Sequence, residues 1–159
     1  MALIFHIIIN KHPGLLNNLT KLIENNKDTE PDLMSRLNAQ DGYGLTLLHR
    51  QVEYGHNDAV KALLNFGVMV DNVNNKKETA LHIAARKGNN EIIAALLEKG
   101  AKPNIQDYQA RTPLYIAVEY GNDGAIGALI NYGAKVDKVD NYGEAALHRA
   151  TRKGHIEAI

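Results

Sequence analysis

The chain contains no cysteine and no tryptophan, and only 4 prolines among its 159 residues. Without cysteine there is no disulfide framework, thiol nucleophile or zinc–thiolate site. Lysine and arginine together number 18, as do aspartate and glutamate, so the formal net charge at pH 7 is zero. Nucleic-acid binding needs an excess of Lys and Arg on one face, so the composition argues against that class of partner. The missing cysteines favour an intracellular, cytoplasmic protein.

Long hydrophobic runs are missing as well. The apolar stretch at residues 3–9 lacks a basic leader and a small-residue cleavage site, and it is far shorter than a membrane span. We interpret it as the buried face of a first helix. The sequence therefore predicts neither a signal sequence nor a membrane partner.

What the chain does contain is a motif that returns about every 33 residues, a period typical of one class of helical repeat protein. A threonine, a leucine, a histidine and two glycines stand in register in successive copies. These positions are Thr46, Thr79 and Thr112; Leu48, Leu81, Leu114 and Leu147; His49, His82 and His148, with Tyr115 in the third copy; Gly55, Gly88, Gly121 and Gly154; and Gly67, Gly100 and Gly133. The chain is therefore a tandem repeat.

The motif at residues 112–117 (Thr-Pro-Leu-Tyr-Ile-Ala), read together with residues 79–84 (Thr-Ala-Leu-His-Ile-Ala), resembles the ankyrin repeat signature. The resemblance covers roughly residues 41–159 and, more weakly, residues 1–40. It implies an all-α fold, an ankyrin-repeat solenoid. Each repeat would be a β-turn or hairpin followed by an antiparallel helix pair, and the repeats would form a curved stack that recognises other proteins.

We expect one domain over residues 1–159. Residues 1–40 read as a degenerate N-terminal capping repeat, residues 41–73, 74–106 and 107–139 as full repeats, and residues 140–159 as a partial repeat. Residues 25–32 break the helical pattern and predict a polar loop, and residues 38–40 restore the closing phase of a repeat. The short last repeat indicates either a fragment of a longer array or a frayed end.

Each full repeat carries helix boundary signals. The threonine in register can cap a first helix, and Pro113 suits the first helical position, where a missing N–H costs nothing. The glycines in register fall where helices must stop, since a left-handed residue is cheapest as glycine. Gly124 and Gly127 lie inside the second helix of the third repeat at a cost of about 1 kcal/mol each, so we expect that helix to be the softest. Gln51, at an alanine phase, needs a polar partner.

The histidines in register do not predict a metal or catalytic site. Packed helices lie about 8–10 Å apart, whereas zinc needs ligands near 2 Å, so histidines one repeat apart cannot share an ion. We expect each imidazole to bond backbone groups in the turns and to tie one repeat to the next. Asp41, Asp107 and Asp140 occupy the turn phase, where aspartate bonds its own backbone. Without a phosphate-binding loop or nucleophile elbow, the sequence predicts no enzyme, cofactor or metal.

The positions that differ between copies are the ones left over for binding. In the proteins that this sequence resembles, the turn tips and the exposed side of the first helix form a concave binding surface. Mapped by phase, the candidate partner-binding residues are Tyr43, Leu45, Glu53, Tyr54, Lys76, Glu78, Arg86, Lys87, Tyr108, Arg111, Glu119, Tyr120, Tyr142, Arg152 and Lys153.

Tyrosine and charge distinguish this candidate set. Tyrosine is a preferred interface anchor because it buries a large area at low entropy cost, although these tyrosines could instead cover the helix–turn junction. The charges alternate along the array, from Glu53 to Arg86 and Lys87, and again in the next two copies. They could set a ligand of matched charge in register. The interpretation we favour is a ladder of exposed ion pairs between repeats, each contributing about 0–1 kcal/mol.

The sequence therefore predicts a non-enzymatic, monomeric interaction module that holds a protein or peptide against its concave face. One alternative is the targeting or regulatory arm of a longer multidomain protein, such as a bacterial host-directed effector, with catalysis outside residues 1–159. A second alternative, nucleic-acid binding, is disfavoured by the zero net charge.

Overall fold

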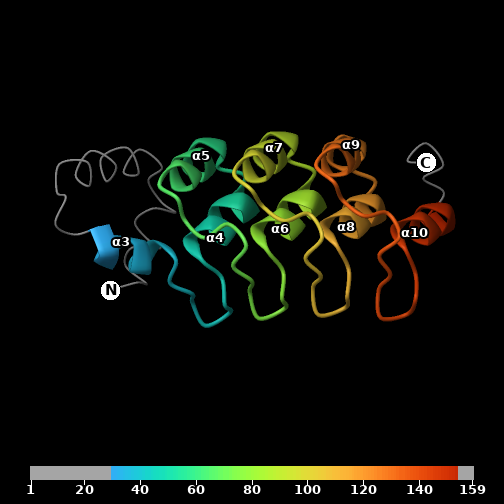
Figure 1. The fold of residues 1–159 in the computed structure, drawn as a ribbon, viewed down its shortest axis with the longest axis horizontal. Coiled ribbons are helices and arrows are strands. Elements are labelled where there is room, and N and C mark those ends of the chain that lie inside the picture. The colour runs from blue at the N-terminus through green and yellow to red at the C-terminus, as the bar shows by residue number, and fades with distance from the viewer. Residues whose placement is uncertain (1–29, 154–159) are drawn as a thin grey trace.

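The computed structural model describes the backbone of residues 30–153 and the side chains of residues 34–152 (Figure 1). Within this range the chain forms eight α-helices and no β-strand; an isolated antiparallel β-bridge joins Val139 and Ala145. The helices are α3 (Glu30–Leu37), α4 (Leu47–Tyr54), α5 (Asn57–Asn65), α6 (Ala80–Lys87), α7 (Asn90–Glu98), α8 (Pro113–Tyr120), α9 (Asp123–Asn131) and α10 (Ala146–Lys153).

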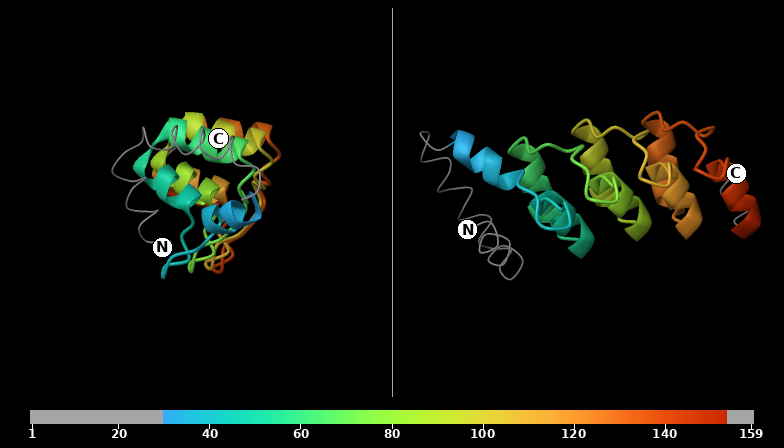
Figure 2. Two further views of the ribbon diagram at one scale, coloured as in Figure 1. Left: turned by 90° about the vertical axis from the view of Figure 1, so that its left-hand side faces the viewer. Right: turned by 90° about the horizontal axis from the view of Figure 1, so that it is seen from below.

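The helices from α4 onward lie in two layers, with the first helix of each repeat in one layer and the second helix in the other (Figure 1). Contacts run along each layer, from α4 through α6 and α8 to α10 and from α5 through α7 to α9. The loops that precede the first helices project together from one side of the row, and the end-on view in Figure 2 shows successive repeats behind one another. The predicted all-helical repeat solenoid is confirmed.

The helix boundaries follow the predicted signals. The hydroxyls of Thr46, Thr79 and Thr112 accept hydrogen bonds from the third helical residue and so cap α4, α6 and α8. Pro113 opens α8. The residue that ends each of these helices has a φ between +68° and +71°, the left-handed conformation that favours glycine, as at Gly88.

The hydrophobic core runs along the row between the two layers. Its largest fully buried side chains alternate between the layers, for example Leu63, Leu81, Leu96 and Leu114. Each repeat therefore buries its apolar face against its neighbours, as expected for a solenoid. Gln51 is 1% exposed, and its side-chain carbonyl oxygen lies 2.8 Å from His56 Nδ1, which supplies the polar partner that the sequence requires.

The second helix of the third repeat, α9, contains both expected glycines. Gly124 faces the preceding repeat closely, because an added Cβ would lie 2.2 Å from Asn90 Nδ2, whereas a Cβ on Gly127 would meet nothing within 4 Å. The first glycine therefore allows close packing of α9 on α7, and the second has no packing reason. That α9 is the softest helix stays a prediction. Within residues 30–153 no helix has the length and apolar character that crossing a bilayer requires.

The start of the described chain corrects one prediction. The prediction of a polar loop over residues 25–32 is wrong for the last of these residues, because α3 already begins at Glu30. Proline is tolerated in the first turn of a helix, so Pro31 does not prevent this start. Residues 38–40 do close a repeat, as predicted. Met69 N donates to Asn38 Oδ1 at 2.7 Å, and Gln40 Nε2 donates to Val73 O at 2.7 Å, so these residues bond the same segment of the next repeat. The predictions for residues 1–29 and 154–159 lie outside the described residues.

Candidate functional site

Each repeat begins with a finger, by which we mean residues 41–45, 74–78, 107–111 and 140–144. Asp41 Oδ1 accepts hydrogen bonds from the backbone N–H groups of Tyr43 and Leu45, at 2.8 and 3.0 Å. The first residue of each later finger makes the same two bonds. The fourth residue is left-handed even where it is not glycine, as at Lys77 (φ +58°) and Ala110 (φ +60°). The predicted turn role of the aspartates is thus confirmed.

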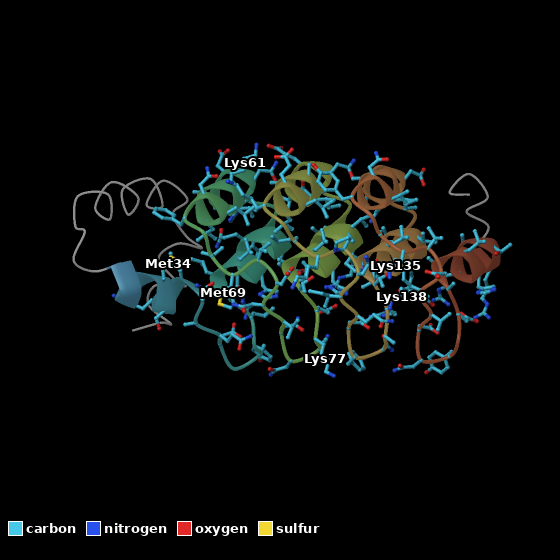
Figure 3. The ribbon with its side chains drawn as sticks, in the orientation of Figure 1. Met34, Lys61, Met69, Lys77, Lys135 and Lys138 are labelled. Carbon is cyan, nitrogen blue, oxygen red and sulfur yellow. The ribbon has the colours of Figure 1, made fainter. Side chains whose placement is uncertain are left out.

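The fingers are also bonded to one another. The backbone N–H groups of Asn75, Tyr108 and Asn141 donate to the carbonyl groups of the preceding finger, each at 3.0 Å. In Figure 3 the labelled Lys77 lies at a finger tip, whereas Lys61 lies on the far side of the row, on α5. The fingers therefore form a pre-organised edge, and binding there costs less ordering entropy than binding to free loops.

The buried histidines anchor these fingers to the helices. In His82, Nδ1 lies 3.1 Å from Thr79 N, which donates to it, so Nε2 carries the ring proton and donates to Arg111 O at 3.2 Å in the next finger. Burial lowers the pKa of His82 to about 4, so the ring is neutral at pH 7. His49 bonds Glu78 O in the same way at 3.1 Å. The predicted tie between repeats is confirmed.

The third repeat uses a different tie. Tyr115 stands at the histidine phase, and its hydroxyl donates to Asp140 Oδ2 of the next finger at 2.9 Å. Burial and this carboxylate raise the pKa of Tyr115 to about 12. At the end of the described row, His148 is exposed and accepts only the bond from Ala145 N, at 3.0 Å. Among the residues with described positions, no group of three or more His, Asp or Glu side chains could hold a metal ion.

The five candidate tyrosines lie on the surface. Tyr43, Tyr108 and Tyr142 are in fingers, with 72%, 55% and 83% of their area exposed. Tyr54 and Tyr120 end α4 and α8 and are 53% and 56% exposed. More than half of each residue's area is therefore open to solvent, although the ring of Tyr54 also lies 5.8 Å from the ring of His56, just after α4.

The charged candidates are mostly engaged with one another. Lys87 Nζ lies 3.0 Å from Glu53 Oε1 of the preceding repeat, which is a rung of the predicted ladder. Arg86 instead bonds Glu78 within its own repeat, at 2.6 Å. Glu78, assigned by its phase to the exposed surface, is buried at 5% exposure. Burial opposes its ionisation, but hydrogen bonds from Arg86 and Asn74 hold the pKa of Glu78 below its usual value. Its carboxylate therefore stabilises the finger.

A similar network joins the third and fourth repeats. Arg111 bonds Asp107 at 2.7 Å and Glu119 at 3.3 Å, and Arg149 bonds Glu119 at 2.5 Å. Arg152 pairs with Glu144 of its own repeat. Glu119 thus bridges two repeats, and the ladder runs through Arg149 at this junction. Lys153 belongs to α10, but its side chain lies outside the described ones.

Two hollows open between the fingers and the first helices, at junctions two repeats apart. The first hollow, of about 410 Å³, lies between repeats one and two, and the second, of about 340 Å³, lies between repeats three and four. The first is lined by Tyr43, Leu45, Arg50, Glu53, Asn74, Asn75, Lys76, Glu78, Ile83 and Arg86, and the second by Gln109, Arg111, Tyr115, Glu119, Asp140, Tyr142, Glu144, Arg149 and Arg152.

The hollows bring together most of the predicted set. Tyr54, Lys87, Tyr108 and Tyr120 line neither hollow. Sequence reasoning missed several lining residues, above all the arginines Arg50 and Arg149. A signal was present, because these arginines share a phase at which the two middle repeats carry isoleucine.

A family model described as "Ankyrin repeats (3 copies)" matches residues 5–107 and 104–159. No curated protein matches the chain.

Proposed function

The chain belongs to the ankyrin-repeat family, and on this premise we propose that it binds a protein or peptide through its concave face, formed by the fingers and the exposed sides of the first helices. Ankyrin repeats are generally protein–protein interaction modules, and proteins built from them are typically non-enzymatic. We further propose that the module works as a single cytoplasmic domain and a monomer, with residues 1–40 as its degenerate capping repeat.

The observation that carries the proposal is the exposure of tyrosine on this face. Five candidate tyrosines are more than half exposed, whereas the recurring threonine and leucine of each full repeat are buried. A rigid, amphipathic ring is the kind of side chain that anchors protein interfaces. The bonds between fingers support the same reading, because a pre-formed surface loses little entropy when a partner binds.

The test compares tyrosines on and off this face. Tyr54→Ala combined with Tyr120→Ala should reduce partner capture from cells that express the tagged full chain by at least about tenfold, since anchor residues contribute about 1–2 kcal/mol or more each. The melting temperature should not change, because both side chains are exposed. Tyr132→Ala is the matched control, because Tyr132 is 46% exposed but follows α9 in the other layer. Undiminished capture by the double variant would overturn the proposal.

A further inference from the structure

The two hollows occupy equivalent positions in the repeat but differ in chemistry. The charged side chains of the second hollow are paired with acidic groups of the fold, although the buried Nε of Arg149 has no hydrogen-bond partner among the described residues. Its arginines pair with Asp107, Glu119 and Glu144, and the hydroxyl of Tyr115 donates to Asp140. Each of these charged groups already has a partner within the fold. A ligand that competed for them would have to break existing ion pairs, so the second hollow offers little net attraction.

The first hollow has an apolar floor instead. Leu45 and Ile83 stand at the phases where the second hollow carries Arg111 and Arg149. Leu45 is only partly buried, and it packs on the core while facing the hollow. An apolar group placed there would be removed from water without displacing an ion pair.

The rim of the first hollow carries one cation in excess. Arg50 bonds Asp41 at 2.6 Å, and the other acidic groups, Glu53 and Glu78, bond Lys87 and Arg86. The ammonium group of the exposed Lys76 forms no hydrogen bond or ion pair with any residue of the described part of the chain. At the same phase the second hollow has Tyr142, which carries no charge.

From these differences we infer that the first hollow is the anchor site for the partner. It takes an apolar side chain of an extended peptide on Leu45 and Ile83, with an aspartate or glutamate next to that residue paired to Lys76. The exposed ring of Tyr43 covers the edge of the hollow and contacts the same segment. This inference rests on the proposed function. It adds the chemical class of the ligand and the junction between repeats that binds it.

The probe is a peptide selected from a random dodecapeptide library. Each peptide is attached to the display carrier through its C-terminus, so the side chains of Asp and Glu are its only carboxylates. Peptides are selected for binding to the full chain. We expect the selected peptides to share an apolar residue beside Asp or Glu. For one such peptide, made with an amidated C-terminus, fluorescence anisotropy then gives the affinity for each variant.

Lys76→Glu should weaken binding of that peptide by about tenfold, since reversing the charge replaces an attraction with a repulsion. Lys135→Glu, the same charge reversal at an exposed lysine that lines neither hollow, should alter the affinity by less than about twofold. A peptide whose acid is replaced by lysine should bind the Lys76→Glu variant better than it binds the wild type. Leu45→Arg, which copies the second hollow, should abolish binding.

The outcomes separate the two claims. Equal effects of Lys76→Glu and Lys135→Glu, or selected peptides without an acid beside the apolar residue, would overturn this inference and leave the proposed function standing. Peptide binding that is lost only with Tyr54→Ala and Tyr120→Ala would do the same. Selection of no peptide at all would also overturn this inference, whereas the proposed function fails only if capture of a partner is undiminished in the Tyr54→Ala and Tyr120→Ala double variant.

Discussion

Replacing His82 with alanine should break the tie between the second and third repeats. The side chain is 0% exposed, accepts a hydrogen bond from Thr79 N at 3.1 Å and donates one to Arg111 O at 3.2 Å. Alanine would leave Thr79 N without this acceptor, at about 1–3 kcal/mol, and would remove the bond to Arg111 O, about 0.5–1.5 kcal/mol, although that oxygen still accepts from Asp107 N at 2.9 Å; it would also lose packing. We expect the free energy of unfolding to fall by roughly 3 to 5 kcal/mol, a large part of a typical domain stability of about 5–15 kcal/mol.

Urea unfolding followed by far-UV circular dichroism measures this loss, and the chain supplies its own control. His148 occupies the same phase but is exposed, and among the described residues it bonds Ala145 N alone. His148→Ala should therefore cost no more than about 1 kcal/mol. If the two substitutions destabilise the protein equally, the buried imidazole does not couple the repeats and the reasoning fails.

Three further outcomes follow from other contacts. The pKa of His82 is about 4 in the folded state and near 6.5 when unfolded, so the unfolded chain binds more protons between these pH values. The free energy of unfolding should therefore fall by roughly 3 kcal/mol as the pH drops from 6.5 to 4. In urea titrations at several pH values, His82→Ala should flatten this dependence. Gly127→Ala should raise the melting temperature, because alanine favours the helix by about 0.5–1 kcal/mol. Gly124→Ala should leave the melting temperature nearly unchanged, because Asn90 must rotate away from the new methyl group. Equal gains in melting temperature would contradict the close approach of Asn90 to Gly124. Tyr115→Phe should lower the unfolding free energy by about 1–2 kcal/mol, since it removes the hydroxyl bond to the aspartate of the next finger, and an unchanged urea midpoint would show that this bond does not contribute.

The fold could be predicted from the sequence because the residues at the constant positions determine the local backbone conformation. Thr79 caps a helix and Gly88 ends it in a left-handed conformation, and both roles depend on the residue type itself. The histidine tie is equally predictable, because a buried ring with two polar nitrogens must find two partners. Such features repeat with the period, so one copy predicts the next.

The details of the candidate site depend on pairs of residues and were harder to predict. Glu78 is buried because Arg86, eight positions later, reaches its carboxylate. Comparing each position with its equivalents in the other repeats does not reveal a contact between two positions of the same repeat. The hollows arise in the same way. The first hollow has Ile83 at the phase where the second has Arg149, so one has an apolar floor and the other an ion pair with Glu119. The start of α3 at Glu30 was missed because a proline in a polar stretch indicates a loop as readily as a first helical turn.

Hydrogen–deuterium exchange, measured on the chain with and without its captured partner, tests most directly whether the variable face binds. We predict slower exchange in the fingers, at residues 41–45 and 74–78, and in the last turns of α4 and α6, with no change along α5, α7 and α9. Protection that appears along α5, α7 and α9 while the fingers exchange as before would contradict the account.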